Sequence, residues 1–271
     1  MSKYSHLPVE QPRIMKIDSI TDEAEGIKTF TFKEKFNSSP GQFVMLWIPR
    51  LNMKPFGVSY MDEEKFSVTV SNVGEFTNEL FKKKEGEIIG IQGPYGTGFV
   101  MDKKNTVLVA GGYGTAPLAF LAEELEKSGA NVTLIIGART KSQLVYTNRF
   151  KNSKVNAIFC TDDGSFGKKG FTTDALKEVL ENDSTIDFVY TVGPEIMMKK
   201  VIEITDENNI GCQASLERYM KCGFGVCGQC CVDDSGDRVC KSGPVYEKDY
   251  IKKYIKEFGH YKRDGTGKKS S

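Results

Sequence analysis

A group of cysteines near the end of the chain restricts its fold more than any other feature of the sequence. Three of them follow the spacing C-x4-C-x2-C, and a fourth comes shortly afterwards: Cys222, Cys227, Cys230 and Cys240. This is the plant-type spacing for a [2Fe–2S] cluster, in which four thiolates bind two irons. The backbone must wrap closely round such a cluster, and Gly223, Gly225 and Gly228 permit that approach. The spacing therefore predicts an iron–sulfur protein.

The main alternative for these cysteines is a structural zinc site with four thiolate ligands. Zinc ribbons usually have two C-x2-C pairs, and this chain has one. A disulfide framework is disfavoured, because a long chain crowds five of its seven cysteines between Cys222 and Cys240. We expect Cys231, which adjoins a ligand, to point away from the cluster. Cys160 and Cys212 are expected to be buried as small hydrophobic residues.

The first hundred residues have the pattern of short β-strands without intervening helices. Each segment is rich in Val, Ile, Phe and Thr, and Gly or Pro turns separate the segments. The predicted strands are Ile14–Ile20, Gly26–Phe32, Gln42–Ile48, Phe66–Ser71 and Glu87–Ile91. This series predicts a small antiparallel barrel, with one helix at Thr77–Lys84.

Strands and helices alternate after Met101, which predicts a parallel sheet covered on both faces. The predicted elements are strands at Thr106–Ala110, Val132–Gly137, Val155–Cys160 and Phe188–Val192, and helices near Ala116–Lys127, Thr173–Leu180 and Glu195–Glu207. The segment Cys212–Val245 is too short for its own core, so we expect its cluster to organise it. The polar end, Lys262–Ser271, is expected to fray. The predicted domains are a β-barrel at 10–101, an α/β domain at 102–211 and a cluster-binding subdomain at 212–250.

Three turns of the predicted α/β domain suggest a dinucleotide site. The turn Gly111-Gly112-Tyr113-Gly114-Thr115 links a buried strand to a helix, where glycines and helix N–H groups can bind a pyrophosphate. This turn lacks the full G-x-G-x-x-G motif of dinucleotide-binding proteins. An ordinary strand-to-helix turn explains the glycines equally well. Two further turns follow strands at the edge where parallel sheets bind ligands. The predicted contacts are Gly112, Gly114, Thr115, Arg139, Gly193 and Pro194.

Two segments of the predicted barrel suggest a second ligand. Lys54-Pro55-Phe56-Gly57-Val58-Ser59 combines a cation, a rigid turn and an aromatic ring. Gly74-Glu75-Phe76-Thr77 opens the predicted helix, whose N-terminus could hold a second pyrophosphate. A proline on an edge strand and a capping threonine explain these residues equally well.

The charge balance excludes some classes of partner. The chain has 37 basic and 36 acidic residues and a formal net charge of +1, so it has no basic footprint for nucleic acid. No apolar run is long enough to span a membrane. Residues 1–8 lack the apolar core of a signal peptide. We therefore expect a cytoplasmic protein that binds neither nucleic acid nor membrane.

Taken together, these motifs resemble the ferredoxin–NADP reductase superfamily across almost the whole chain. That resemblance implies a barrel that binds FAD, followed by an α/β domain that binds NAD(P). The flavin motif of the superfamily, Arg-x-Tyr-Ser or Arg-Pro-x-Ser, has Lys in place of Arg and Gly in place of Ser here. A lysine can still pair with a phosphate, but without a bidentate fork. The implied FAD contacts are Lys54, Pro55, Phe56, Gly57, Thr69, Val70, Ser71, Phe76 and Thr77.

The C-terminal part narrows the resemblance. Ser215–Cys222, Val239–Tyr246, Asp162–Gly167 and Gly193–Met197 are similar to the family of electron-transfer subunits of dihydroorotate dehydrogenase B. That similarity implies FAD, a [2Fe–2S] cluster and NAD(H) as cofactors. It also implies an FMN-containing dihydroorotate dehydrogenase catalytic subunit as partner, in a heterotetramer with two copies of each subunit. Electrons would pass between the partner's FMN and NAD+ in pyrimidine biosynthesis, with no catalytic residue for dihydroorotate on this chain.

Other functions share parts of this pattern. The gamma subunits of cytoplasmic hydrogenases and of anaerobic sulfite reductases have most of these features. A self-sufficient reductase that serves a soluble ferredoxin and a zinc-binding interaction protein are the further alternatives. Arg139 and Lys141 could hold the 2′-phosphate of NADP, so the choice between NAD and NADP stays open, with NAD preferred.

Overall fold

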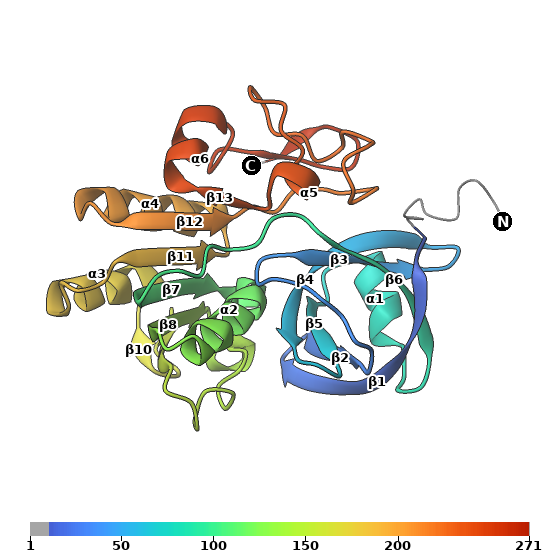
Figure 1. Ribbon diagram of the computed structural model, residues 1–271, viewed down its shortest axis with the longest axis horizontal. Coiled ribbons are helices and arrows are strands. Elements are labelled where there is room, and N and C mark those ends of the chain that lie inside the picture. The colour runs from blue at the N-terminus through green and yellow to red at the C-terminus, as the bar shows by residue number, and fades with distance from the viewer. Residues whose placement is uncertain (1–10, 271) are drawn as a thin grey trace.

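The computed structural model describes residues 11–270 and has three parts (Figure 1). A closed β-barrel lies beside an α/β domain, and the C-terminal segment touches both. The expectation that residues 1–8 lack a signal-peptide core concerns a part of the chain outside the described residues.

The barrel closes from six antiparallel strands in the order β1-β2-β5-β4-β3-β6, which confirms the predicted architecture. The strands are β1 (Arg13–Ala24), β2 (Ile27–Phe32), β3 (Phe43–Ile48), β4 (Asn52–Met61), β5 (Phe66–Ser71) and β6 (Ile88–Tyr95). Apolar side chains of these strands fill the interior, and Phe30, Phe66 and Val68 are completely buried there.

Strand β4 decides between the two interpretations of Lys54–Ser59, a rigid turn or a proline on an edge strand, in favour of a strand. Pro55 lies inside this strand, opposite Met45 of β3. In the described barrel β4 pairs with β3 up to Gly57 and with β5 only from Val58 onward. A proline is tolerated at this point because β4 has one partner strand here, so the missing N–H need not interrupt a second ladder.

Helix α1 (Glu75–Phe81) begins two residues earlier than predicted. Thr77 lies in its first turn, and its Oγ1 accepts hydrogen bonds from the N–H groups of Val73 and Gly74, each at 2.9 Å. The first hydrogen bond within the helix runs from the Asn78 N–H to the Gly74 carbonyl. The N–H groups of residues 75–77 therefore have no acceptor within the helix and can donate to groups outside it.

The α/β domain is built on a seven-stranded sheet in the order β10-β9-β8-β7-β11-β12-β13. Its strands are β7 (Asn105–Gly111), β8 (Asn131–Ala138), β9 (Asn156–Thr161), β10 (Lys168–Lys169), β11 (Phe188–Val192), β12 (Gly211–Ser215) and β13 (Val245–Glu247). All pairs are parallel except that of β12 with β13. This result confirms the predicted parallel sheet and adds three strands, β10, β12 and β13.

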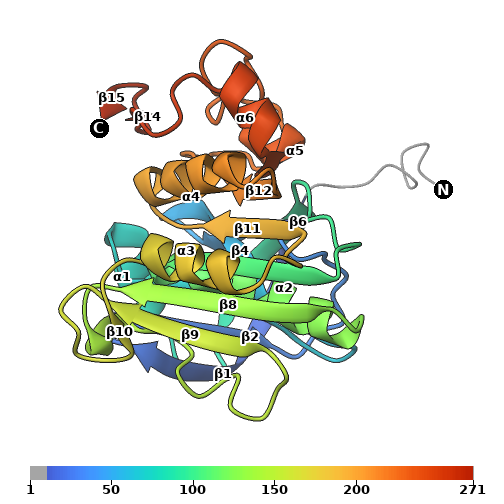
Figure 2. The same cartoon turned by 90° about the vertical axis from the view of Figure 1, so that its left-hand side faces the viewer.

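Helices cover both faces of this sheet, as predicted. Helix α2 (Thr115–Lys127) lies on the side of the barrel and packs against β4 (Figure 1). Helices α3 (Thr172–Asn182) and α4 (Glu195–Glu207) lie on the other face (Figure 2). Successive residues of β7 alternate between the two cores, with Val107 facing α3 and α4 and Leu108 facing α2.

The C-terminal segment is anchored at both ends in the same sheet, because it leaves through β12 and returns through β13. It contains helix α5 (Val239–Ser242) and is followed by helix α6 (Lys248–Tyr254). Leu216, Met220 and Val232 are buried in the same core as α4. Apolar packing on the sheet therefore helps to hold this segment, and the organising role of the cluster stays a prediction.

The end of the chain, predicted to fray, forms a hairpin of β14 (Lys262–Arg263) and β15 (Lys269–Ser270). Arg263 Nη2 donates to both carboxylate oxygens of Asp233, at 2.9 and 3.1 Å. Gly265 lies against the Tyr219 ring, where a Cβ atom would be 2.6 Å away. The prediction was wrong because these polar residues make tertiary contacts.

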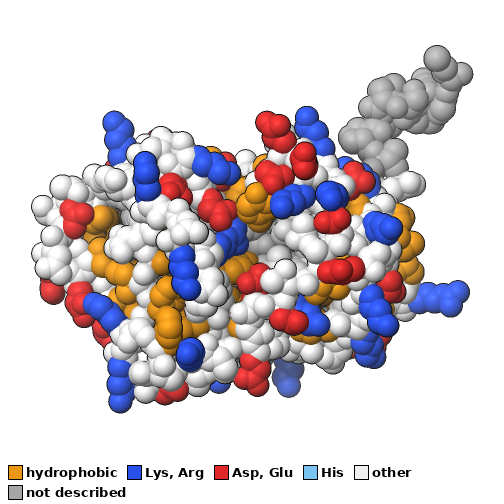
Figure 3. Space-filling model, turned by 90° about the horizontal axis from the view of Figure 1, so that it is seen from below, with side chains coloured by type: hydrophobic (Ala, Val, Ile, Leu, Met, Phe, Trp, Pro, Cys, Tyr) orange, Lys and Arg blue, Asp and Glu red, His pale blue; other side chains and the backbone are white. Residues whose placement is uncertain are grey.

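Charges of both signs are interspersed over the face seen in Figure 3, in line with the net charge of +1. Within residues 11–270, the helices are all too short or too polar to cross a membrane.

Candidate functional site

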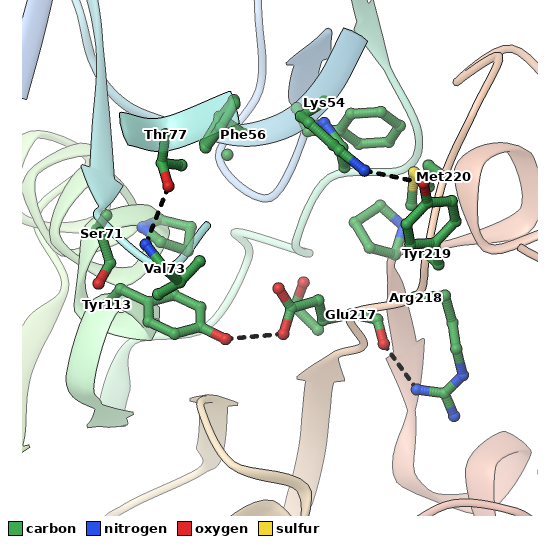
Figure 4. A pocket seen from close by; sticks show the side chains of 18 of the residues that line it. Lys54, Phe56, Ser71, Val73, Thr77, Tyr113, Glu217, Arg218, Tyr219 and Met220 are labelled. Atoms are coloured by element: carbon green, nitrogen blue, oxygen red, sulfur yellow. Dashed lines mark hydrogen bonds between the residues drawn. The ribbon is translucent and has the colours of Figure 1, made fainter. Parts of the chain in front are cut away.

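A cavity of about 690 Å³ lies where the barrel, the α/β domain and the C-terminal segment meet. Its volume is in the range of cofactor sites. The barrel contributes β4, β5 and the start of α1, while the turn before α2 and the residues after β12 form the opposite wall (Figure 4). The predicted residues that line it are Lys54, Pro55, Phe56, Gly57, Thr69, Ser71, Phe76, Thr77 and Gly114.

The other predicted contacts lie outside the lining of this cavity. The side chain of Val70 is completely buried in the barrel core. Thr115 is also completely buried, and its hydroxyl donates to the Gly112 carbonyl at 2.7 Å. Their side chains therefore serve the fold. The remaining ones, Gly112, Arg139, Gly193 and Pro194, lie at the ends of β7, β8 and β11.

The charge and the rings on the barrel side suit a flavin dinucleotide. Lys54 Nζ donates to the Tyr219 hydroxyl at 3.0 Å, and an ammonium has three N–H donors, so two can serve an anion. The rings of Phe56 and Phe76 stack with centroids 5.9 Å apart, forming an apolar surface. A Cβ atom on Gly57 would lie 3.6 Å from Pro117, which is ordinary van der Waals contact.

Apart from Gly114, the sequence did not single out the residues on the opposite wall. The hydroxyl of Tyr113 donates to Glu217 Oε2 at 2.8 Å across the cavity (Figure 4). Burial and the Glu217 carboxylate raise the pKa of Tyr113. Glu217 follows β12, and the carboxyl end of a parallel strand was a signal that could have identified it. No sequence signal indicated Lys262 and Arg263, which reach the cavity from the terminal hairpin.

A buried ion network holds this wall in place. Arg218, with its side chain 2% exposed, donates to Glu257 Oε1 at 2.5 Å and also to Glu195 at the start of α4. Its Nη1 donates to the Glu217 carbonyl at 2.8 Å (Figure 4). Within the described part of the chain, Nη2 has no hydrogen-bond partner. Two carboxylates around one guanidinium fix the backbone of residues 217–218 relative to α4.

The three predicted dinucleotide turns lie at one edge, because β8, β7 and β11 are neighbours in the sheet. A Cβ atom on Gly114 would be 2.5 Å from the Val192 carbonyl oxygen, so glycine is needed there for packing between turns. Gly112 differs, with φ +56° and no atom within 4 Å of such a Cβ. Its open surroundings leave room for a phosphate to approach the backbone. Arg139 is exposed at the end of β8.

The four predicted cluster ligands are arranged as two pairs. Cys222 and Cys227 are hydrogen-bond neighbours nearer the surface, and Cys230 and Cys240 are neighbours in the interior. Cys222 Sγ accepts from the N–H groups of Val226 at 3.4 Å and Cys227 at 3.5 Å. Two thiolates for each of two irons is the donor set that a [2Fe–2S] cluster requires, and N–H groups aimed at sulfur suit it.

Cys222 and Cys240 differ in acidity. Burial favours the neutral thiol of Cys222, but the N–H groups of Cys227 and Val226 and the Cys227 side chain outweigh it and lower the pKa of Cys222 to about 6. Burial, and then the hydrogen bond with Cys230, raises the pKa of Cys240 to about 12. Cys222 is therefore prepared as a thiolate, whereas Cys240 must lose a proton when iron binds.

The arrangement bears on the zinc alternative. Paired thiols fit two irons better than one tetrahedral zinc. Cys231 forms a β-bridge with Arg238, and burial raises its pKa. Cys160 and Cys212 are buried, as expected.

Comparisons with known proteins agree with this geometry. A solved structure described as an NADH-dependent reduced ferredoxin-NADP oxidoreductase superposes with a TM-score of 0.80 at 32% identity, covering 91% of this chain and 94% of that one. Phthalate dioxygenase reductase shares the fold, with a TM-score of 0.63 at 19% identity over 72% of this chain and 64% of that one. An oxidoreductase NAD-binding domain family matches residues 108–203. Fold and site thus define an iron–sulfur flavoprotein reductase of the ferredoxin-reductase type.

Two relatives match almost the whole chain. A probable dihydroorotate dehydrogenase B (NAD(+)) electron transfer subunit of Methanocaldococcus jannaschii is 52% identical over 262 residues, which cover 96% of this chain and 99% of that protein. Its counterpart in Methanothermobacter thermautotrophicus is 43% identical over 262 residues, covering 95% and 97%. The chain belongs to the family of dihydroorotate dehydrogenase B electron transfer subunits. The iron–sulfur cluster binding domain of dihydroorotate dehydrogenase B matches residues 217–252.

Proposed function

We propose that this chain carries electrons between an FMN-containing dihydroorotate dehydrogenase catalytic subunit and NAD+. One observation carries the proposal: the cavity and the cysteine segment share a wall. Tyr219 and Met220 line the cavity, and Cys222 follows two residues later. A flavin in the cavity would therefore lie next to a cluster held by that segment.

The residues have separate tasks in this proposal. FAD and the cluster supply the redox chemistry, since a flavin exchanges hydride with NAD(H) and single electrons with iron. Lys54 and the free amides at the start of α1 bind the FAD phosphates, while Phe56 and Phe76 offer an apolar surface. The open turn at Gly112 receives the pyrophosphate of NAD(H).

The cysteines bind the irons and bring the cluster to the surface. Cys227 is exposed, and beside it Val226 is 75% exposed and Phe224 36% exposed. Apolar side chains that face solvent next to a redox centre suit the docking of a partner. We propose that the catalytic subunit docks there and that two copies of each subunit form a heterotetramer. No residue on this chain is assigned a role in the oxidation of dihydroorotate.

A reconstitution experiment tests the proposal. The purified chain should contain one FAD and two irons, and it should reduce artificial acceptors with NADH but leave dihydroorotate unchanged. Mixed with the catalytic subunit, it should form a stable complex that reduces NAD+ with dihydroorotate. The Cys222→Ser variant should fail in the coupled assay and keep the direct reaction of NADH with its flavin.

Two outcomes would contradict the proposal. Recovery of FMN alone after heat release of the flavin would refute the FAD assignment. If the chain forms no complex with the dihydroorotate dehydrogenase subunit but transfers electrons to a hydrogenase or sulfite reductase module, the role in pyrimidine biosynthesis is refuted. The proposed electron relay would still hold.

A further inference from the structure

A segment of the α/β domain reaches across to the barrel at the two strands that line the cavity. Residues 144–150, between β8 and β9, contact the barrel through two side chains. The hydroxyl of Tyr146 lies 2.5 Å from Thr69 Oγ1 on β5. Arg149 Nη2 donates to the Ser59 carbonyl on β4 at 2.8 Å. Both contacts therefore join the domain of the predicted NAD site to the strands of the predicted FAD site.

The direction of the Tyr146 hydrogen bond follows from the hydroxyl groups behind it. Thr29 Oγ1 donates to Glu23 Oε1 at 2.7 Å, because an ionised carboxylate can only accept. Thr69 Oγ1 lies 2.8 Å from Thr29 Oγ1 and donates its one proton to Ser59 Oγ at 3.0 Å, so it has no proton left for Tyr146. Tyr146 must be the donor to Thr69. Thr69 lines the cavity, yet its hydroxyl is engaged by protein groups, including a contact of 3.0 Å with Ser59 Oγ.

Arg149 is held as firmly as Tyr146. Its Nε and Nη2 donate to the two carboxylate oxygens of Glu123 on α2, at 2.7 and 2.9 Å. Its guanidinium carbon lies 4.6 Å from the centre of the Tyr146 ring. Tyr146 is 5% exposed and has φ 60°, in the left-handed region that favours glycine. Such a conformation persists in an aromatic residue only where surrounding contacts hold it.

We propose that Tyr146 and Arg149 are positioning residues that fix the α/β domain on the barrel and thereby set the distance for hydride transfer. The inference rests on the proposed function, in which a hydride with two electrons passes from C4 of NADH to FAD, solvent supplies one further proton, and NAD+ is left. A displacement of about 1 Å can cost on the order of 10²-fold in rate. The pair acts through Ser59 and Thr69, which belong to the strands that line the cavity.

The Tyr146→Phe variant tests the inference, because it removes one hydroxyl and leaves Thr69 with its other partners. In anaerobic stopped-flow experiments with the FAD-loaded protein, we expect the flavin to be reduced by NADH about tenfold more slowly. The Kd for NADH should not change, and NADH deuterated at C4 should give a full isotope effect. Reduction by dithionite, which needs no nicotinamide geometry, should proceed at the wild-type rate.

A matched control is the Tyr190→Phe variant. Tyr190 is also fully buried, and its hydroxyl donates to the Val100 carbonyl at 2.7 Å. This change deletes the same chemical group at a site outside the cavity lining. We expect the control to keep the wild-type rate of hydride transfer, even if its thermal stability falls as far as that of Tyr146→Phe.

A second readout needs no cofactor. In hydrogen exchange of the apoprotein, the amides near Ser59 and Thr69 should exchange faster in Tyr146→Phe than in Tyr190→Phe. Arg149→Lys keeps a cation over the Tyr146 ring but cannot span both Glu123 and the Ser59 carbonyl. Arg149→Lys should therefore slow hydride transfer in the same way. If Tyr146→Phe does not fold, the rate measured for Arg149→Lys tests the positioning role instead.

Equal hydride-transfer rates in Tyr146→Phe and Tyr190→Phe would overturn the inference. The inference would also be overturned if Tyr146→Phe reacts more slowly only because it binds NADH more weakly. If NADH cannot reduce the wild-type flavin at all, the proposed function itself fails, and this outcome is distinct from an unaffected variant.

Discussion

The Lys54 ammonium lies 4.1 Å from the centre of the Tyr219 ring and donates to the hydroxyl of the same residue at 3.0 Å. Lys54 belongs to barrel strand β4, whereas Tyr219 comes shortly before the first cluster cysteine, Cys222. One contact thus joins the proposed flavin site to the segment that bears the thiols. Gly265 of the terminal hairpin lies against the same ring.

The Lys54→Met variant should bind FAD about tenfold more weakly, because it keeps the apolar stem but loses a cation worth roughly 1–2 kcal/mol. Titration of the apoprotein with FAD, followed by flavin fluorescence, measures the Kd. Lys65→Met is the matched control, since the Lys65 ammonium lies over the Tyr60 ring at 5.6 Å and outside the cavity lining. Equal Kd values for the two variants would rule out a role for Lys54 in FAD binding.

The Gly57→Ser variant should fold normally and bind FAD more tightly. A serine Cβ would make ordinary contact with Pro117 at 3.6 Å, and its hydroxyl would restore the group found in the related flavin motif. One added hydrogen bond is worth about 1 kcal/mol, or roughly a fivefold lower Kd. Isothermal titration of the apoprotein would detect it. A weaker affinity would show that Gly57 is needed for space.

Replacement of single cysteines distinguishes the ligands from their neighbour. Cys230→Ser should lose most of its iron, because one iron would keep a single thiolate. Cys231→Ser should keep near-native iron content and visible absorption, since Cys231 lies outside the two thiol pairs. Iron analysis and absorption spectra of both variants provide the comparison. Equal loss of iron in the Cys230→Ser and Cys231→Ser variants would contradict the assignment of the cluster ligands.

The Arg218→Leu variant should be strongly destabilised, because it leaves the buried Glu257 carboxylate without its cation and removes the guanidinium from Glu195, which keeps Lys262 as a cation at 3.8 Å. Breaking such a network costs about 3–5 kcal/mol, which corresponds to a lowering of the thermal midpoint by roughly 10 °C. Scanning calorimetry measures this shift. Arg13→Leu, at an exposed site on β1, should change the midpoint little. A small effect at Arg218 would mean that the network adds little to stability.

The sequence was sufficient for features that repeat along the chain. Alternating apolar residues predicted five of the barrel strands, and a buried run such as Thr106–Ala110 predicted a strand of the parallel sheet. Local pattern could not decide at Lys54–Ser59 between a turn and a strand that contains a proline, and the chain continues there as β4. A proline fits a strand when one neighbour is missing, and that depends on which strands lie beside it.

The opposite wall of the cavity was beyond sequence reasoning for a related cause. Tyr113 and Glu217 are far apart in the chain and meet only because β7 and β12 end at the same edge of the sheet. The hairpin that carries Arg263 was predicted to fray because its residues are polar. Its order depends on a distant carboxylate, Asp233, which no local pattern could reveal. Spacing located the cysteines because that motif is short and continuous.

The antiparallel pair β12 and β13 has a consequence for how electrons leave the molecule. Both ends of the cysteine segment enter adjacent strands of one sheet, so they are held about 4.8 Å apart. A redox module on a flexible tether must swing between donor and acceptor, and that search can limit turnover. Here Ser215 and Val245 are paired residues of adjacent strands, so the cysteine segment is joined to the sheet at both ends and not through a flexible linker. On the proposed function, we expect turnover to be governed by the chemical steps and by the arrival of the partner.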